Sequence, residues 1–120
     1  MVKTKQEQRQ ESVEKRFGGN GTIHITQIIE KTELLANCRL FARMTINPGC
    51  SLGYHQHENE EEIYYILSGQ GVVNDNGTMR TVNPGDAVLT GNGASHSIEN
   101  QGTEPLELVA TVLTYQPPER

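Results

Sequence analysis

The sequence is poor in the residues that mark several common classes of protein. Its 120 residues include no tryptophan, only two cysteines and only four histidines. No run of about 18 apolar residues is present, so no transmembrane helix is expected, and residues 1–19 lack the apolar core of a signal peptide. Cys38 and Cys50 are too few for a disulfide scaffold and lack metal-site spacing. We therefore expect a cytoplasmic chain with reduced thiols and no membrane partner.

Basic charge is also scarce. Fifteen acidic residues stand against ten basic ones, which gives a formal net charge of -5. Residues 1–16 carry five bases and three acids, a net charge of +2, so the other 104 residues carry -7. An acidic chain without a basic stripe is poorly suited to the phosphate backbone. We expect no nucleic-acid partner.

The N-terminal segment differs from the rest of the chain. Residues 1–16 contain good helix formers but few apolar anchors, which predicts a frayed helix or a disordered arm. The glycine-rich stretch FGGNG at 17–21 breaks the chain. The predicted organisation is a charged arm over 1–21, one domain over 22–116 and a short tail over 117–120.

Beyond residue 22 the pattern is that of short strands separated by turns. β-branched and alternating runs predict strands near 22–29, 39–46, 62–67, 72–75, 78–82, 87–90, 95–99 and 106–115. The Asn76-Gly77 pair predicts a hairpin turn. The only other helix candidate is short, around 31–35. This pattern predicts an all-β sandwich or barrel.

The expected core is small for a chain of this size. We therefore expect a homodimer in which two copies share an apolar sheet face. Candidates for that face lie on the last predicted strand, namely Val109, Val112 and Leu113.

Histidines provide the main chemical signal. His55 and His57 are two residues apart, so on a strand both side chains face the same way. A carboxylate from the next strand and a distant histidine can complete a metal site. From these residues alone the alternative stays open: histidines are often ordinary polar residues, and the acidic run at 58–62 can be a solvated loop.

Two spaced patterns surround these histidines. The first is G-x5-H-x-H-x4-E-x6-G, filled by Gly49, His55, His57, Glu62 and Gly69. The second is G-x5-G-x-G-x2-H-x3-N, filled by Gly85, Gly91, Gly93, His96 and Asn100. Together they resemble the two motifs of the cupin superfamily, with Gly91 in the place of a proline. The resemblance spans about 49–100.

This resemblance implies a fold, a metal and its ligands. The fold is the all-β double-stranded β-helix, or jelly-roll barrel, here with a short charged N-terminal arm. The implied ligands of a divalent transition metal (Mn, Fe, Ni, Co or Zn) are His55, His57, Glu62 and His96. Glu62 is preferred to Glu61 because only Glu62 lies seven residues before Gly69.

Other polar residues have two readings each. Tyr64 shares a strand face with Glu62, so it is a candidate hydrogen-bond donor or catalytic acid at the site, or else an aromatic residue that fills the barrel. Arg43 can bind a carboxylate or phosphate, or form a surface salt bridge. His24 is expected to be structural or exposed.

Cupins support many chemistries, so the implied function stays broad. We expect a metal-binding protein that acts on or binds a small polar metabolite, carboxylate or sugar-like. If it is an enzyme, dioxygenase, isomerase and decarboxylase or lyase reactions are all open. The alternative is a non-catalytic module that binds or senses a small ligand. Oxalate decarboxylases of the superfamily have an arginine three residues before the first metal histidine, where this chain has Leu52, which argues against that reaction.

Overall fold

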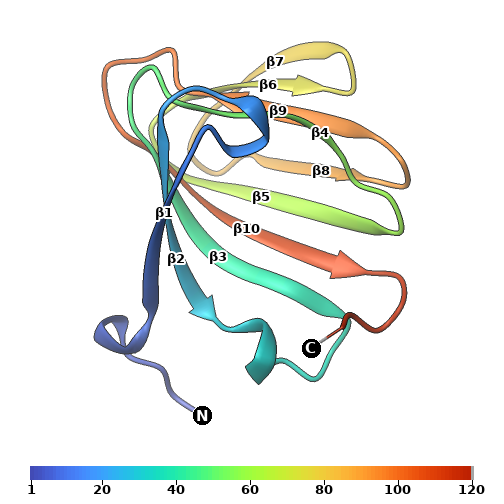
Figure 1. The fold of residues 1–120 in the computed structure, drawn as a ribbon. Helices are drawn as coiled ribbons and strands as arrows, with labels where there is room; N and C mark the ends of the chain where they lie inside the picture. Colours follow the sequence, from blue (N-terminus) through green and yellow to red (C-terminus); the bar gives the residue numbers. More distant parts are fainter. Residues whose placement is uncertain (120) are drawn as a thin grey trace.

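A computed structural model describes residues 1–119 as two antiparallel sheets that face each other (Figure 1). The larger sheet contains, in spatial order, β1 (Arg9–Glu14), β2 (Thr22–Ile29), β3 (Cys38–Ile46), β10 (Leu106–Thr114), β5 (Glu60–Ser68) and β8 (Ala87–Gly91). The smaller sheet contains β4 (Ser51–Gln56), β9 (Ser95–Glu99), β6 (Gly71–Asp75) and β7 (Thr78–Val82). The predicted all-β jelly roll is confirmed.

The core lies between the two sheets and follows the alternation of the strands. Strand β10 pairs with β3 on one side and β5 on the other. Along β10, Leu106, Leu108, Ala110 and Val112 are each at most 1% exposed. Val112 therefore lies inside the barrel and is unavailable for the dimer face proposed from the sequence. Its neighbours Val109 and Leu113 are half-buried on the outer side.

The charged N-terminal segment is ordered, in contrast to the frayed helix or disordered arm expected from its composition. Strand β1 pairs with β2 along its whole length, with Val13 opposite Ile23. Val13 also packs against the core. The pairing satisfies backbone groups at the edge of β2 that would otherwise be open, which outweighs the low strand propensity of this sequence. The division of the chain at residue 22 stays a prediction.

The helices of the described residues are single 3-10 turns of three residues each. They are η1 (Lys5–Glu7), η2 (Arg16–Gly18) and η3 (Lys31–Glu33), the last within the segment where a short helix is predicted. None of the helices in residues 1–119 is long and apolar enough to cross a membrane.

The turn η2 links β1 to β2 and packs against β4. Its backbone lies so close that a methyl group added at Gly53 would overlap the carbonyl oxygen of Phe17. A methyl group at Gly19 would likewise overlap the carbonyl oxygen of Ser51. Glycine at these two positions allows the N-terminal segment to reach the histidines of β4.

Candidate metal centre

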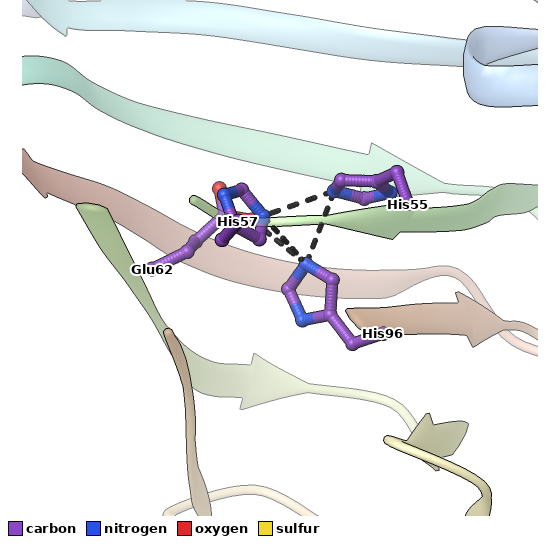
Figure 2. Close-up of side chains that lie close together, drawn as sticks. All are labelled: His55, His57, Glu62 and His96. Carbon is purple, nitrogen blue, oxygen red and sulfur yellow. Dashed lines mark hydrogen bonds and ion pairs between the residues drawn. The ribbon is translucent and has the colours of Figure 1, made fainter. Parts of the chain in front are cut away.

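Both sheets contribute side chains to one cluster in the barrel interior. His55 on β4 lies directly opposite His96 on β9 in the antiparallel register. His57 follows the end of β4, and Glu62 lies on β5 in the other sheet. Figure 2 shows the three imidazole rings and the carboxylate directed toward one another. The structure thus brings the four residues proposed as ligands together.

The donor atoms of this cluster are close and shielded from solvent. The Nε2 atom of His96 lies 3.0 Å from Nε2 of His57 and 3.1 Å from Nε2 of His55. Oε1 of Glu62 lies 3.0 Å from Nε2 of both His57 and His96, and 3.9 Å from Nε2 of His55. His57, Glu62 and His96 are at most 4% exposed, while His55 is half-buried.

These distances fit a shared divalent ion. Two ligands about 2.1 Å from one ion and at right angles to each other lie about 3.0 Å apart. The short separations among His57, His96 and Glu62 match that value. Three imidazoles and a carboxylate are a donor set that suits first-row transition metals. The four residues can therefore hold a metal ion.

Hydrogen bonds behind the rings direct their free nitrogens to the centre. Nδ1 of His57 donates to Oε2 of Glu60 at 2.6 Å, and Nδ1 of His55 donates to the carbonyl oxygen of Gly53 at 2.7 Å. With the proton placed on Nδ1, each neutral ring presents the lone pair of Nε2 to the cluster. Nδ1 of His96 is buried without a partner among the described residues.

The cluster favours an ionised Glu62. Before an ion binds, burial opposes ionisation, but hydrogen bonds donated by protonated ring nitrogens of His55, His57 and His96 outweigh burial and hold the pKa of Glu62 well below its usual value of 4.5. Burial also lowers the pKa of His57, yet bonds to Glu62 and Glu60 raise it overall, whereas burial dominates and lowers the pKa of His96. Metal binding at these groups is therefore coupled to proton release.

Tyr64 lies beside the cluster, as its strand position predicts. It is 1% exposed, its ring stacks on His96 with centroids 4.8 Å apart, and its hydroxyl oxygen lies 3.4 Å from Nε2 of His96. Burial, together with the charge of Glu62, raises the pKa of Tyr64 well above 10.0. The phenol therefore keeps its proton and is a hydrogen-bond donor rather than a base.

A cavity of about 30 Å³ borders the cluster. Polar and charged lining comes from Arg16, Arg39, Tyr64 and three of the four cluster residues. Phe17, Leu40, Met44, Leu52 and Val112 complete its walls.

The remaining candidates lie elsewhere. Arg43 forms a surface ion pair with Glu107 at 2.8 Å, and exposed His24 contacts Ser12 across β1 and β2. Three further residues at the site, Glu60, Arg16 and Phe17, were not among the candidates from the sequence; Glu60 was expected in a solvated acidic run. Glu60 stands three residues after His57, but its role depends on a turn that no pattern specified. Nothing in the sequence placed residues 16–17 near the site.

Known proteins share these features of the chain. The family model described as "Cupin domain" matches residues 42–112. An oxalate-binding protein of Thermotoga maritima is 42% identical over 113 residues, which cover 94% of this chain and 93% of that protein. Mannose-1-phosphate guanylyltransferase of Klebsiella pneumoniae is 34% identical over 67 residues, 56% of this chain but only 14% of that enzyme.

Solved structures agree with the fold. A crystal structure described as a predicted oxalate decarboxylase from Thermotoga maritima matches with a TM-score of 0.90 and 42% identity, covering 95% of this chain and 99% of that one. KdgF from Halomonas sp. matches with a TM-score of 0.75 at 21% identity, covering 99% of this chain and 94% of that one, and shows the fold alone. With a family model over more than half of its length and a full-length relative of this similarity, the chain belongs to the cupin family.

Proposed function

We propose that this cupin binds one divalent transition metal (Mn, Fe, Ni, Co or Zn) through His55, His57, Glu62 and His96 and uses it to bind a small carboxylate. The observation that supports the proposal most is the convergence of three Nε2 atoms and one carboxylate oxygen. Four protein ligands leave positions of a six-coordinate ion for a small molecule.

The ion, when bound, supplies a Lewis acid that orients and polarises an oxygen ligand. The protein's own residues orient the ligating rings, donate a hydrogen bond and line the cavity. Glu60 and Gly53 hold the rings of His57 and His55 in orientation. The hydroxyl of Tyr64 lies 3.4 Å from Nε2 of His96, close enough to the centre to donate a hydrogen bond to a bound molecule. Leu52 and Met44 keep one wall of the cavity apolar, which strengthens charge interactions within it.

Two observations favour a small carboxylate over a sugar-like ligand. The cavity of about 30 Å³ is small, which favours a ligand of few atoms. The Thermotoga maritima relative, which aligns with 94% of this chain, is named an oxalate-binding protein. The second proposed class, sugar-like metabolites, is larger than a small carboxylate and would need a wider opening of the cavity.

An enzymatic role is the second candidate, and Tyr64 supports it. A protonated phenol 3.4 Å from Nε2 of His96 is placed to donate a proton to a bound ligand. Such a donor serves a decarboxylase, lyase or isomerase, whereas a dioxygenase depends on the ion itself. Under this candidate Tyr64→Phe abolishes turnover of a small acid and leaves binding of the acid largely intact. A pure binding module shows no turnover in the native protein.

Metal content tests the ligand assignment. Elemental analysis of purified protein should show about one ion per chain, and His55→Ala and His96→Ala should each lose most of it. His24→Ala is the matched control because His24 is exposed and its ring hydrogen-bonds to Ser12, away from the cluster. Stoichiometric metal in both site variants would refute the assignment.

Calorimetric titration tests the ligand class. Oxalate should bind the metal-loaded protein and not the metal-free protein, and mannose 6-phosphate should bind more weakly than oxalate. If the metal-loaded protein binds neither compound, the proposed function is wrong.

We also propose that the protein is a cytoplasmic homodimer. The modest core supports association, and free cysteines at 38 and 50 are compatible with a reducing compartment. Sedimentation at micromolar concentration should give twice the mass of 13.3 kDa. A monomer there would refute the dimer.

A further inference from the structure

The turn η2 covers the metal centre. The ring of Phe17 stacks on the imidazole of His55, with centroids 3.8 Å apart and planes 16° apart. The guanidinium of Arg16 lies 4.8 Å from the centroid of the Phe17 ring. Both side chains line the cavity beside the cluster. A segment outside both cupin motifs thus forms part of the cavity wall.

This segment is held in place by its backbone. The amide of Ser51 donates to the carbonyl oxygen of Asn20, and the amide of Asn20 donates to the hydroxyl of Ser51, each at 2.9 Å. The amide of Lys15 closes the hairpin through the carbonyl oxygen of Gly21 at 2.9 Å. Arg16 therefore projects from a fixed support on β4 rather than from a free tail.

Arg16 has an unused hydrogen-bond donor at the cavity. Its Nε is buried and has no hydrogen-bond partner among the described residues. The other arginine of the cavity, Arg39, is already paired with Glu60 through bonds of 2.7 and 2.6 Å. Nothing in residues 1–119 forms an ion pair with Arg16. A buried donor without a partner is costly and points to a ligand that satisfies it.

The charges around the cavity define that ligand. Arg39 and Glu60 neutralise each other. A divalent ion adds two positive charges, Glu62 removes one and Arg16 restores one. The loaded site thus carries two positive charges in a small, largely buried space. A dianion of a small dicarboxylic acid balances them, and guanidinium groups match carboxylates in geometry.

We propose that Arg16 binds the carboxylate of a small dicarboxylic acid at the metal centre, and so selects dicarboxylates over monocarboxylates. This inference rests on the proposed function, because it requires a carboxylate at the metal. One end of the acid occupies the open side of the metal centre, and the other accepts hydrogen bonds from Arg16. The structure thereby assigns a ligand-binding role to the β1–β2 connection.

Calorimetry with two probes tests the role of Arg16. The protein is loaded with Mn²⁺, freed of excess ion by gel filtration, and titrated with oxalate or with acetate. In Arg16→Gln, Mn²⁺ content should be unchanged, and oxalate affinity should fall by roughly tenfold or more. Acetate affinity should change far less, so the preference for oxalate over acetate should shrink by a similar factor.

Two further variants separate a direct contact from net charge and from misfolding. Lys15→Gln removes one positive charge from the same segment, but Lys15 is exposed and does not line the cavity. It should bind oxalate nearly as well as the native protein. Arg16→Lys keeps the charge and loses the planar fork, so its oxalate affinity should fall between those of the native protein and Arg16→Gln.

Each outcome has a distinct meaning. If Arg16→Gln and the native protein hold Mn²⁺ and bind oxalate equally, the role of Arg16 is wrong while the proposed function stands. An equal loss in Lys15→Gln and Arg16→Gln also overturns a direct contact. If the Mn²⁺-loaded native protein binds neither acid, both the role of Arg16 and the proposed function are wrong. Should Arg16→Gln fail to fold, Arg16→Lys with native oxalate affinity and selectivity overturns the proposal instead.

Discussion

The hydrogen bond from His57 to Glu60 should contribute measurably to metal affinity. Nδ1 of His57 and Oε2 of Glu60 are 2.6 Å apart, a short bond to a charged acceptor. Loss of such a partner behind a ligating histidine typically weakens metal binding by about 10- to 100-fold. Glu60→Ala removes both the acceptor and its charge. We expect an affinity loss in that range, or about 1.4–2.7 kcal/mol.

Glu60→Gln should have a smaller effect. The amide oxygen of glutamine still accepts a hydrogen bond from Nδ1 of His57, but without the negative charge. Because a neutral hydrogen bond has roughly half the strength of a charge-assisted one, about half of the free-energy loss should remain. The expected weakening is about 3- to 10-fold. Arg39 also loses its bidentate partner in both variants, so the stability of the metal-free protein is measured separately.

Competition with a chromophoric chelator measures these affinities for Co²⁺ or Mn²⁺. Glu58→Gln is the matched control, because Glu58 is exposed and lies two residues from Glu60. The control should retain native affinity. If Glu60→Ala binds metal within twofold of Glu58→Gln, the orientation of His57 does not depend on Glu60 and the reasoning fails.

Two further predictions concern stability. Gly19→Ala should lower the free energy of unfolding by about 1–3 kcal/mol, because the new methyl group meets the backbone of Ser51. Urea titration measures this loss, and Gly102→Ala, where the methyl group has ordinary contact distances, should change it little; equal effects would contradict the steric explanation. The hydrogen bond from Arg43 lowers the pKa of Glu107 below 4.5 despite partial burial, so the stabilisation by Glu107 is full above about pH 4.5 and fades as the pH falls through its lowered folded-state pKa. Native protein and Glu107→Gln should therefore differ in thermal stability near pH 7 and converge in strong acid, and a difference that is independent of pH would exclude the ion pair as its source.

The pairing of His55 with His57 was predictable from local sequence, because their spacing places two side chains on one strand face. The choice of Glu62 over Glu61 by its spacing to Gly69, and the inclusion of His96, came from the resemblance to cupins. The register of β4 against β9 sets His55 opposite His96. This pairing of distant strands could be expected only from the resemblance to cupins.

The N-terminal segment shows what local patterns miss. Its glutamine, glutamate and lysine residues favour a helix or disorder, and only pairing with β2 makes β1 a strand. Arg16 and Phe17 reach the centre through a backbone contact at Gly53, which leaves no periodic signal. Glycine in β4 also interrupts the apolar alternation, and no strand was predicted over Ser51–Gln56.

The division of the cluster between two sheets has a consequence for the order of folding. His55 and His96 belong to the smaller sheet and Glu62 to the larger one, so the donors meet only once the sheets have packed. His96 is far in the chain from the other three donors, so the loop-closure entropy of its contacts must be paid before those contacts can form. A metal ion should therefore leave the folding rate almost unchanged and act by slowing unfolding. Metal loading should therefore lengthen the lifetime of the folded state without speeding folding.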